Sequence, residues 1–503
     1  MAAGWMWGQK RTGGHEGQLW ENVKSQLENV KFSLIIKLST YGRKEVFRLQ
    51  REHSADMIEG SIFKSILWFS IPLLIGNFFQ QLYNTVDSYV VGNYVDTNAL
   101  ASVGASTPVI NMLVGFFMGL STGAGVVISQ YYGAGQEWNM RKAIHSALAL
   151  TGVLSLIFTV AGLAITRPLL RAIGVPAEVL PNSTLYLTIY FMGITFSLFY
   201  NIGAGILRAI GDSKNPLIFL AIASVVNIIL DFLFVCGFHM GVAGVAIATI
   251  TAQAVSSFMV MRKLICTKEC YKVNLRHIRF SPRMVKRIIS IGFPAALQQS
   301  ITSFSNVVVQ SYINYFGAAA MAGYSATLRI DGFLQLPLQS FNMTITTFVG
   351  QNIGAGKYRR VKRGILTAWA MSSVVIFLGV LFMFFYAGSM IGIFTEDQQV
   401  IAVGSSMIRI FAMGYMTLPV VQILNGALRG AGLSKVPMYF MLGTFVVLRQ
   451  IYLMIAVPMT QSLPAVFAGW PLTWAVCAVG MLAYYLKANW LPKEDGEKQG
   501  SKR

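Results

Sequence analysis

The sequence predicts an all-α polytopic membrane protein, with twelve transmembrane helices arranged in two six-helix lobes. Three observations lead to this prediction. The chain has a mean hydropathy of +0.57 and only 12% charged residues, whereas soluble domains average about 25%. Apolar segments of membrane-spanning length follow one another along the chain. Motifs of the first half recur in the same order in the second half.

Twelve apolar segments are each long enough to cross a bilayer as a helix. We expect them at 66–91, 104–131, 143–165, 185–207, 216–238, 242–264, 288–314, 322–349, 364–388, 400–427, 436–458 and 465–487. In the second span Gly115, Gly119 and Gly123 recur at every fourth position. This spacing favours close packing of that span against another helix.

Basic residues are concentrated in alternate loops. Nine Lys and Arg lie within residues 262–287 and five within 357–363, whereas the loops of the opposite side hold only Arg167 and Arg171. The positive-inside rule therefore places both termini in the cytoplasm. The formal net charge of +20 reflects this topology and predicts the lipid bilayer, not nucleic acid, as a partner. The four cysteines suggest neither a disulfide framework nor a metal site.

The two halves of the chain repeat each other. Residues 351–356 read QNIGAG where 130–135 read QYYGAG, and the pattern GxLRxxGxSKxP occurs at both 205–216 and 426–437. Each half holds six spans and starts on the same side of the membrane, so the repeat is parallel. In such folds the substrate site lies between the halves, which move against each other during transport.

The repeat and the charge pattern together predict the boundaries of the chain's parts. We expect a cytoplasmic extension or a mis-assigned start at 1–56, an N-lobe at 57–265, a basic cytoplasmic linker at 266–287, a C-lobe at 288–490 and a disordered cytoplasmic tail at 491–503.

A polar stripe runs along the first span and ends in an acid. The spacings of three, four and three residues place four side chains on one helix face, namely Asn77, Gln80, Asn84 and Asp87. An acid in an apolar span usually marks an ion or substrate pathway, because an ionised carboxylate in hydrocarbon is costly. Another acid, Asp231, lies in the fifth span four residues after Asn227, and Thr249 lies in the sixth. These oxygens suit a proton or a hard cation such as Na⁺.

The second half keeps the polar stripe and loses the acids. Gln299, Thr302 and Asn306 correspond to Asn77, Gln80 and Asn84, but Val309 corresponds to Asp87, and Tyr452 pairs with Asp231. The coupling acids are therefore expected in the first half, with polar residues of both halves lining a substrate cavity.

Two further polar residues are candidates for that cavity. Asn201 lies near the end of the fourth span, and Asp331 lies in the eighth. Asp331 either binds a cationic substrate or belongs to a structural ion pair, and both readings stay open.

The chain resembles the multidrug and toxic compound extrusion (MATE) family over residues 57–490. The resemblance rests on IPLLIGNFFQQLYNTVDSYVVG in the first span, the QYYGAG/QNIGAG pair, the LRAIGDSKNP/LRGAGLSKVP pair and NIILD in the fifth span. It implies a V-shaped cavity between the lobes, and export of amphipathic, often cationic compounds in exchange for H⁺ or Na⁺. By this resemblance Asp87, Asn227, Asp231 and Thr249 form a cation site. The seventh and tenth spans hold no acid, which argues against a second cation site in the C-lobe.

These observations favour a secondary antiporter in the bacterial inner membrane. The protein is expected to act as a monomer, without a cofactor other than H⁺ or Na⁺. The alternative is a flippase for lipid-linked glycans, which would need several cavity-facing cations where the spans offer chiefly Arg329 and Arg449. An enzyme is not expected, because the spans contain no Ser/His, paired-Glu or His-cluster arrangement.

Overall fold

The computed structural model describes residues 57–95 and 97–491, and within these ranges the chain is helical without a β-strand. The predicted extension at 1–56 and the predicted tail beyond Leu491 lie outside the described residues. The first half contains α3 (Ile62–Tyr94), α4 (Thr97–Gly133), α5 (Glu137–Ala172), α6 (Leu180–Ala209), α7 (Lys214–Asp231), η1 (Phe232–Gly237) and α8 (Gly241–Cys266).

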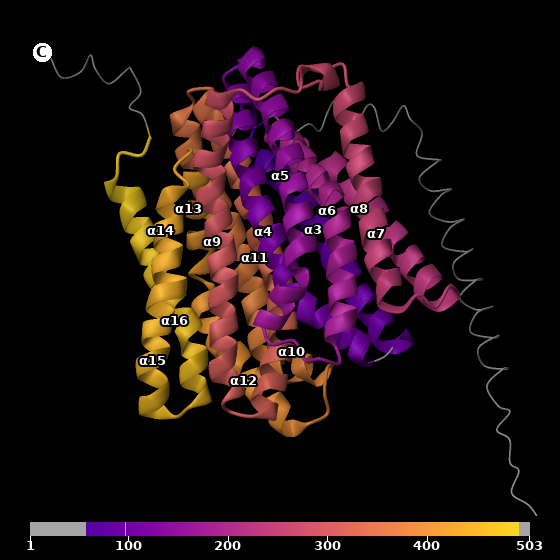
Figure 1. Ribbon diagram of the computed structural model, residues 1–503. Helices are drawn as coiled ribbons and strands as arrows, with labels where there is room; N and C mark the ends of the chain where they lie inside the picture. The colour runs from indigo at the N-terminus through magenta and orange to yellow at the C-terminus, as the bar shows by residue number, and fades with distance from the viewer. Residues whose placement is uncertain (1–56, 96, 492–503) are drawn as a thin grey trace, which may run out of the picture. The chain divides into compact units, whose positions relative to one another are not determined.

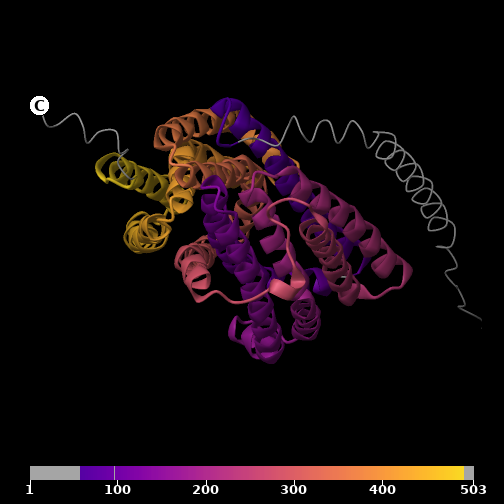
Figure 2. The same cartoon turned by 90° about the horizontal axis from the view of Figure 1, so that it is seen from above.

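The second half begins after a linker that holds a short 3₁₀ turn, η2 (Leu275–His277). Its helices are α9 (Pro282–Asn314), α10 (Ala318–Gly354), α11 (Tyr358–Gly392), α12 (Gln398–Tyr415), α13 (Leu418–Gly430), α14 (Lys435–Met441), η3 (Leu442–Leu448), α15 (Arg449–Thr460) and α16 (Leu463–Lys487). Figures 1 and 2 show that the first-half helices gather on one side of the bundle and the second-half helices on the other.

All twelve predicted spans coincide with helical segments. Within the described part of the chain, nine helices are long and apolar enough to cross a membrane, and there are ten if α12 and α13, which are bent by 53° relative to each other, form one span. The two other predicted spans are α9 and α10, which are 33 and 37 residues long but more polar. A membrane span needs about 20 residues, so both are long enough, and the twelve-helix arrangement is consistent with the structure.

Two spans contain a π-helical turn, in which one residue more than in an α-helix is accommodated. In the fifth span the turn η1 directly follows Asp231. In the eleventh span the turn η3 directly precedes Arg449. The two halves therefore place their irregular turns at different points along the corresponding spans, which changes the register between them.

The two lobes meet along α4 and α9, where small residues allow the backbones to approach closely. A methyl group added at Gly123 would lie 2.5 Å from the Cα of Gly292 and 2.7 Å from the carbonyl oxygen of Ile288. A methyl group at Gly119 would meet the backbone of Ala296. The packing role predicted for these glycines is thus confirmed at both positions.

A reciprocal pair of hydrogen bonds joins the lobes at the end of the bundle that carries the linker. Gln130 on α4 donates from Nε2 to the carbonyl of Gly430 on α13, at 2.9 Å. Gln351 on α10 donates from Nε2 to the carbonyl of Ala209 on α6, at 2.8 Å. Both glutamines open the repeated motif, so the same motif stabilises the interface from each side.

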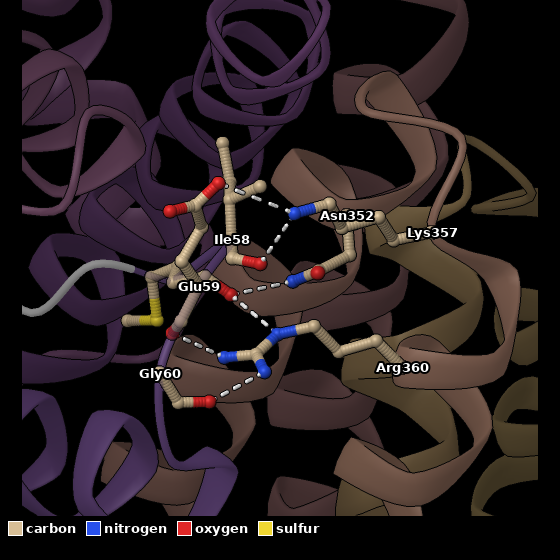
Figure 3. A network of polar contacts seen from close by, with 7 residues as sticks. Ile58, Glu59, Gly60, Asn352, Lys357 and Arg360 are labelled. Atoms are coloured by element: carbon tan, nitrogen blue, oxygen red, sulfur yellow. Dashed lines mark hydrogen bonds and ion pairs between the residues drawn. The ribbon is translucent and has the colours of Figure 1, made fainter.

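The start of the described chain is held by the second half (Figure 3). Arg360 on α11 donates to the carbonyls of Met57, Glu59 and Gly60 at 3.2, 2.7 and 2.7 Å. Asn352 donates to the Met57 carbonyl at 2.9 Å. The segment before α3, which belongs to the first half, is therefore attached to the second.

Candidate functional site

Three helices of the first half bring the predicted cation-coupling residues together. Asp87 comes from α3, Asn227 and Asp231 from α7, and Thr249 from α8, and each side chain is at most 8% exposed. The carboxyl group of Asp87 faces the side chains of the other three residues. Asn227 and Asp231 share one face of α7 because they are four residues apart.

Most polar atoms of this cluster have no partner. Oδ1 of Asp87, both carboxyl oxygens of Asp231 and both polar side-chain atoms of Asn227 are buried without a hydrogen bond. An unsatisfied buried polar group costs about 1–3 kcal/mol, and such groups are rare in folded proteins. Their concentration in one place is typical of a binding site.

The donor set indicates which ligand the cluster would suit. Two carboxyl groups, an amide oxygen and a hydroxyl are hard oxygen donors, which suit a proton or a hard cation such as Na⁺. Within residues 57–95 and 97–491, no group of three or more His, Cys, Asp and Glu side chains could hold a metal ion.

A small cavity lies beside the cluster. It is lined by Asn227 and Thr249, and also by Tyr83, Ser224 and Gln253. Its volume is about 10 Å³, which is near the minimum for one water molecule. Gln253 was not predicted from the sequence, although it lies one helical turn after Thr249. Its Oε1 is also buried without a partner, so it extends the donor set.

Two other candidates of the first half, Asn77 and Asn201, make their hydrogen bonds away from this cluster. Asn77 donates to the hydroxyl of Ser340 on α10 at 3.1 Å, and therefore joins the two lobes. Asn201 donates to the carbonyl of Ser197 at 2.8 Å and lines a separate cavity of about 20 Å³ between α4, α5 and α6. Gln80 is half-buried on α3. The side chain of Asn84 lies outside the described residues.

In the second half, the structure shows a contact for three of the predicted cavity residues. Thr302 donates to the carbonyl of Gln298, one turn earlier on its own helix, at 2.8 Å. The side chain of Gln299 packs against Gly115, so it belongs to the contact between α4 and α9. Asn306 accepts a hydrogen bond from Arg449.

Asp331 is half-buried on α10 and forms no ion pair with any residue that the structure describes. Its Oδ1 has no hydrogen-bond partner. The neighbouring Arg329 is exposed and lies over the ring of Phe394, at 6.0 Å from its centroid. The structure thus favours neither the structural ion pair nor a completed substrate site at Asp331.

The fold and the buried acids together define a polytopic membrane protein of the transporter class. A model of the MatE family matches residues 72–233 and again residues 294–455. The chain belongs to the MATE family. Its two matches show that the halves are repeats of one unit, as the sequence motifs predicted.

Curated relatives agree with this assignment. The chain is 30% identical over 400 residues to the "Probable multidrug resistance protein YpnP" of Bacillus subtilis, covering 78% of this chain and 88% of that protein. It is 24% identical over 376 residues to the "Multidrug export protein MepA" of Staphylococcus aureus, covering 74% of this chain and 83% of that protein.

Solved structures also match over most of the chain. One is described as MATE in the straight conformation, with a TM-score of 0.81 and 25% identity over 86% of this chain and 97% of that one. Another is an outward-facing MATE family transporter of the MOP superfamily, with a TM-score of 0.82 and 25% identity over 88% of this chain and 99% of that one.

Proposed function

We propose that this protein is a secondary antiporter, which exports amphipathic organic cations in exchange for H⁺ or Na⁺. One observation supports the ion coupling above all others. Two buried acids, Asp87 and Asp231, face each other between α3 and α7, and no ion pair joins either of them to a described residue. The names of the relatives, which describe multidrug resistance and export, support the substrate class.

The four clustered side chains would have two different roles in ion binding. Two carboxylates at close range in a medium of low dielectric repel each other, so the pair is stable only when a proton or a cation neutralises part of its charge. Asn227 and Thr249 would supply neutral oxygens to the bound ion. Exposure to water would restore hydration of the carboxylates and allow the ion to leave.

Coupling follows from the state of this pair. If the loaded cluster favours one arrangement of the lobes and the empty cluster favours the other, the ion gradient shifts the population between them. The organic cation would then bind in the cavity between the lobes when the acids are free. We further propose that the protein lies in the bacterial plasma membrane with both termini in the cytoplasm, and that it acts as a monomer without a cofactor.

Ethidium efflux from vesicles under separately imposed Na⁺ and pH gradients tests this function. The parent protein should export ethidium under one gradient, and Asp87→Asn should lose gradient-driven efflux because the pair can no longer exchange its ion. Asp397→Asn serves as a matched control, since Asp397 is exposed and caps α12.

Two results would contradict the proposal. Full efflux by Asp87→Asn would remove that acid from the coupling mechanism. No efflux by the folded parent under either gradient would favour the alternative function of a lipid flippase, which a fluorescent-lipid translocation assay detects.

A further inference from the structure

A buried guanidinium lies in the second half without an acidic partner. Arg449, the first residue of α15, is 2% exposed. It donates to Oδ1 of Asn306 at 3.3 Å and to the hydroxyl of Thr473 at 3.1 Å. Its guanidinium carbon lies 5.5 Å and 5.2 Å from the ring centroids of Phe445 and Trp470. No described acid lies within ion-pair distance of it.

The π-helical turn η3 identifies the first-half residue to which Arg449 corresponds. Before this turn the repeats are offset by 221 residues, as Pro216 and Pro437 show. A π-helical turn adds one residue to a helix, so the offset after η3 is 222. The two family-model matches, 72–233 and 294–455, likewise begin and end 222 residues apart. Arg449 therefore corresponds to Asn227.

Burial supports this register over the one that the sequence suggested. An offset of 222 pairs Asp231 with Leu453, and both are 0% exposed. The offset of 221 pairs Asp231 with Tyr452, which is half-buried and donates its hydroxyl to the carbonyl of Ala465 at 3.0 Å. The pairing with Tyr452 is replaced by the pairing with Leu453, because in a span that is apolar on nearly all faces a one-residue insertion does not change the mean hydropathy.

In the corrected register, the positions that correspond to the first-half cluster carry a positive charge and no acid. Val309 stands in place of Asp87, and Leu453 in place of Asp231, so both acids are replaced by aliphatic residues. The amide of Asn227 is replaced by the guanidinium of Arg449. Each half also contributes a threonine from its sixth span, Thr249 in one and Thr473 in the other, although the two are 224 residues apart and so are not at the same repeat position.

The surroundings of Arg449 stabilise a positive charge that is covalently fixed in place. The faces of aromatic rings attract a cation, most strongly where water is excluded, and two rings lie near this guanidinium. The hydroxyl and the amide oxygen satisfy two of its N–H groups. A second cation at the same place would be repelled by a charge that the covalent chain holds there.

We propose that the Arg449 guanidinium is a built-in cation that occupies the C-lobe counterpart of the N-lobe cation site. The C-lobe then remains in a permanently loaded form and binds no ion from solution, and the exchange of ions takes place in the N-lobe alone. The statement about exchange rests on the proposed antiport. The occupation of the pseudo-equivalent site by Arg449 does not depend on that proposal.

The thermal unfolding of the purified full chain in detergent tests this occupation without a transport assay. Arg449→Ala should unfold at a lower temperature than the parent. Added guanidinium, at about 20 mM and thus far below denaturing concentrations, should restore at least half of the lost midpoint by binding in the space that the side chain leaves. Urea, which has a similar planar shape and no charge, should not restore it.

Arg329→Ala is the matched control, because Arg329 is exposed in the same lobe and contacts one ring. Its midpoint should not respond to guanidinium. Equal rescue of Arg449→Ala by urea, or no rescue by either compound, would overturn the proposal. If Arg449→Ala does not fold, the unfolding midpoints of Arg449→Lys and Arg449→Gln test the proposal instead. The proposal requires Lys to retain more of the midpoint than Gln, and the reverse order contradicts it. These unfolding results do not depend on transport, so they test the proposal even if the parent protein exports nothing.

Discussion

A close backbone contact between the lobes predicts a strong effect of a single methyl group. In Gly123→Ala, the new Cβ would lie 2.5 Å from the Cα of Gly292, about 0.9 Å short of the 3.4 Å at which ordinary contact begins. The opposing atoms belong to the backbone of α9, so no side-chain rotation can relieve the overlap. The helices must separate, and overpacking of this kind costs about 1–3 kcal/mol.

Two other glycines provide a graded comparison. In Gly115→Ala the new Cβ would lie 2.6 Å from Cγ of Gln299, and this flexible side chain can move away. In Gly152→Ala, on α5, no atom lies within 4 Å of the new Cβ. The cost should therefore fall from Gly123 to Gly115, and at Gly152 alanine should be neutral or stabilising because it favours helix formation.

Thermal unfolding of the three variants in one detergent measures this order. A cysteine pair placed across α4 and α9 would report separately on separation of the helices, through loss of disulfide formation in Gly123→Ala. If Gly123→Ala were as stable as Gly152→Ala and formed the disulfide at the parent's rate, the close approach of the two backbones would be refuted.

Two predictions concern the end of the bundle that carries the linker. Gln351→Leu leaves the carbonyl of Ala209 without its side-chain donor, and should cost about 0.5–1.5 kcal/mol, measured as a lower unfolding midpoint. An unchanged midpoint would contradict a stabilising role. Arg360→Met removes the hydrogen bonds to three carbonyls of residues 57–60. Amide hydrogen exchange over residues 57–65 should become about tenfold faster if one net hydrogen bond of about 1.4 kcal/mol is lost. Unchanged exchange there would show that Arg360 does not hold the segment.

Much of the helical arrangement could be predicted from the sequence. A bilayer requires apolar segments of spanning length and favours basic residues in the cytoplasmic loops. These two patterns locate the spans directly in the sequence, and all twelve predicted spans coincide with helices. The cluster of Asp87 with Asn227, Asp231 and Thr249 could also be expected, because buried acids in apolar spans must face polar neighbours. What could not be predicted is where helices gain a residue, since the turns η1 and η3 leave hydrophobicity unchanged.

The proposed cavity residues show a second limit of sequence reasoning. A polar side chain on a helix can reach the carbonyl one turn earlier as easily as a ligand, as Thr302 does. It can also pack against the opposite lobe, as Gln299 does. Periodicity places such residues on a face, whereas the neighbouring helices decide what that face meets. Gln253 cannot be predicted from the sequence, because a single amide has no signal apart from its spacing to Thr249.

The reciprocal hydrogen bonds of Gln130 and Gln351 show a symmetry in the contact between the two lobes. The two donors are 221 residues apart, and so are the two acceptors, Ala209 and Gly430. A contact that occurs twice with the partners exchanged is the mark of an isologous interface, as in a homodimer with a twofold axis. The interface between the lobes is therefore arranged like that of a homodimer of six-helix chains, although here one covalent chain supplies both halves. Because the linker joins the halves, they need not find each other in the membrane, and the same pairing is compatible with acids in one half and none at the corresponding positions of the other.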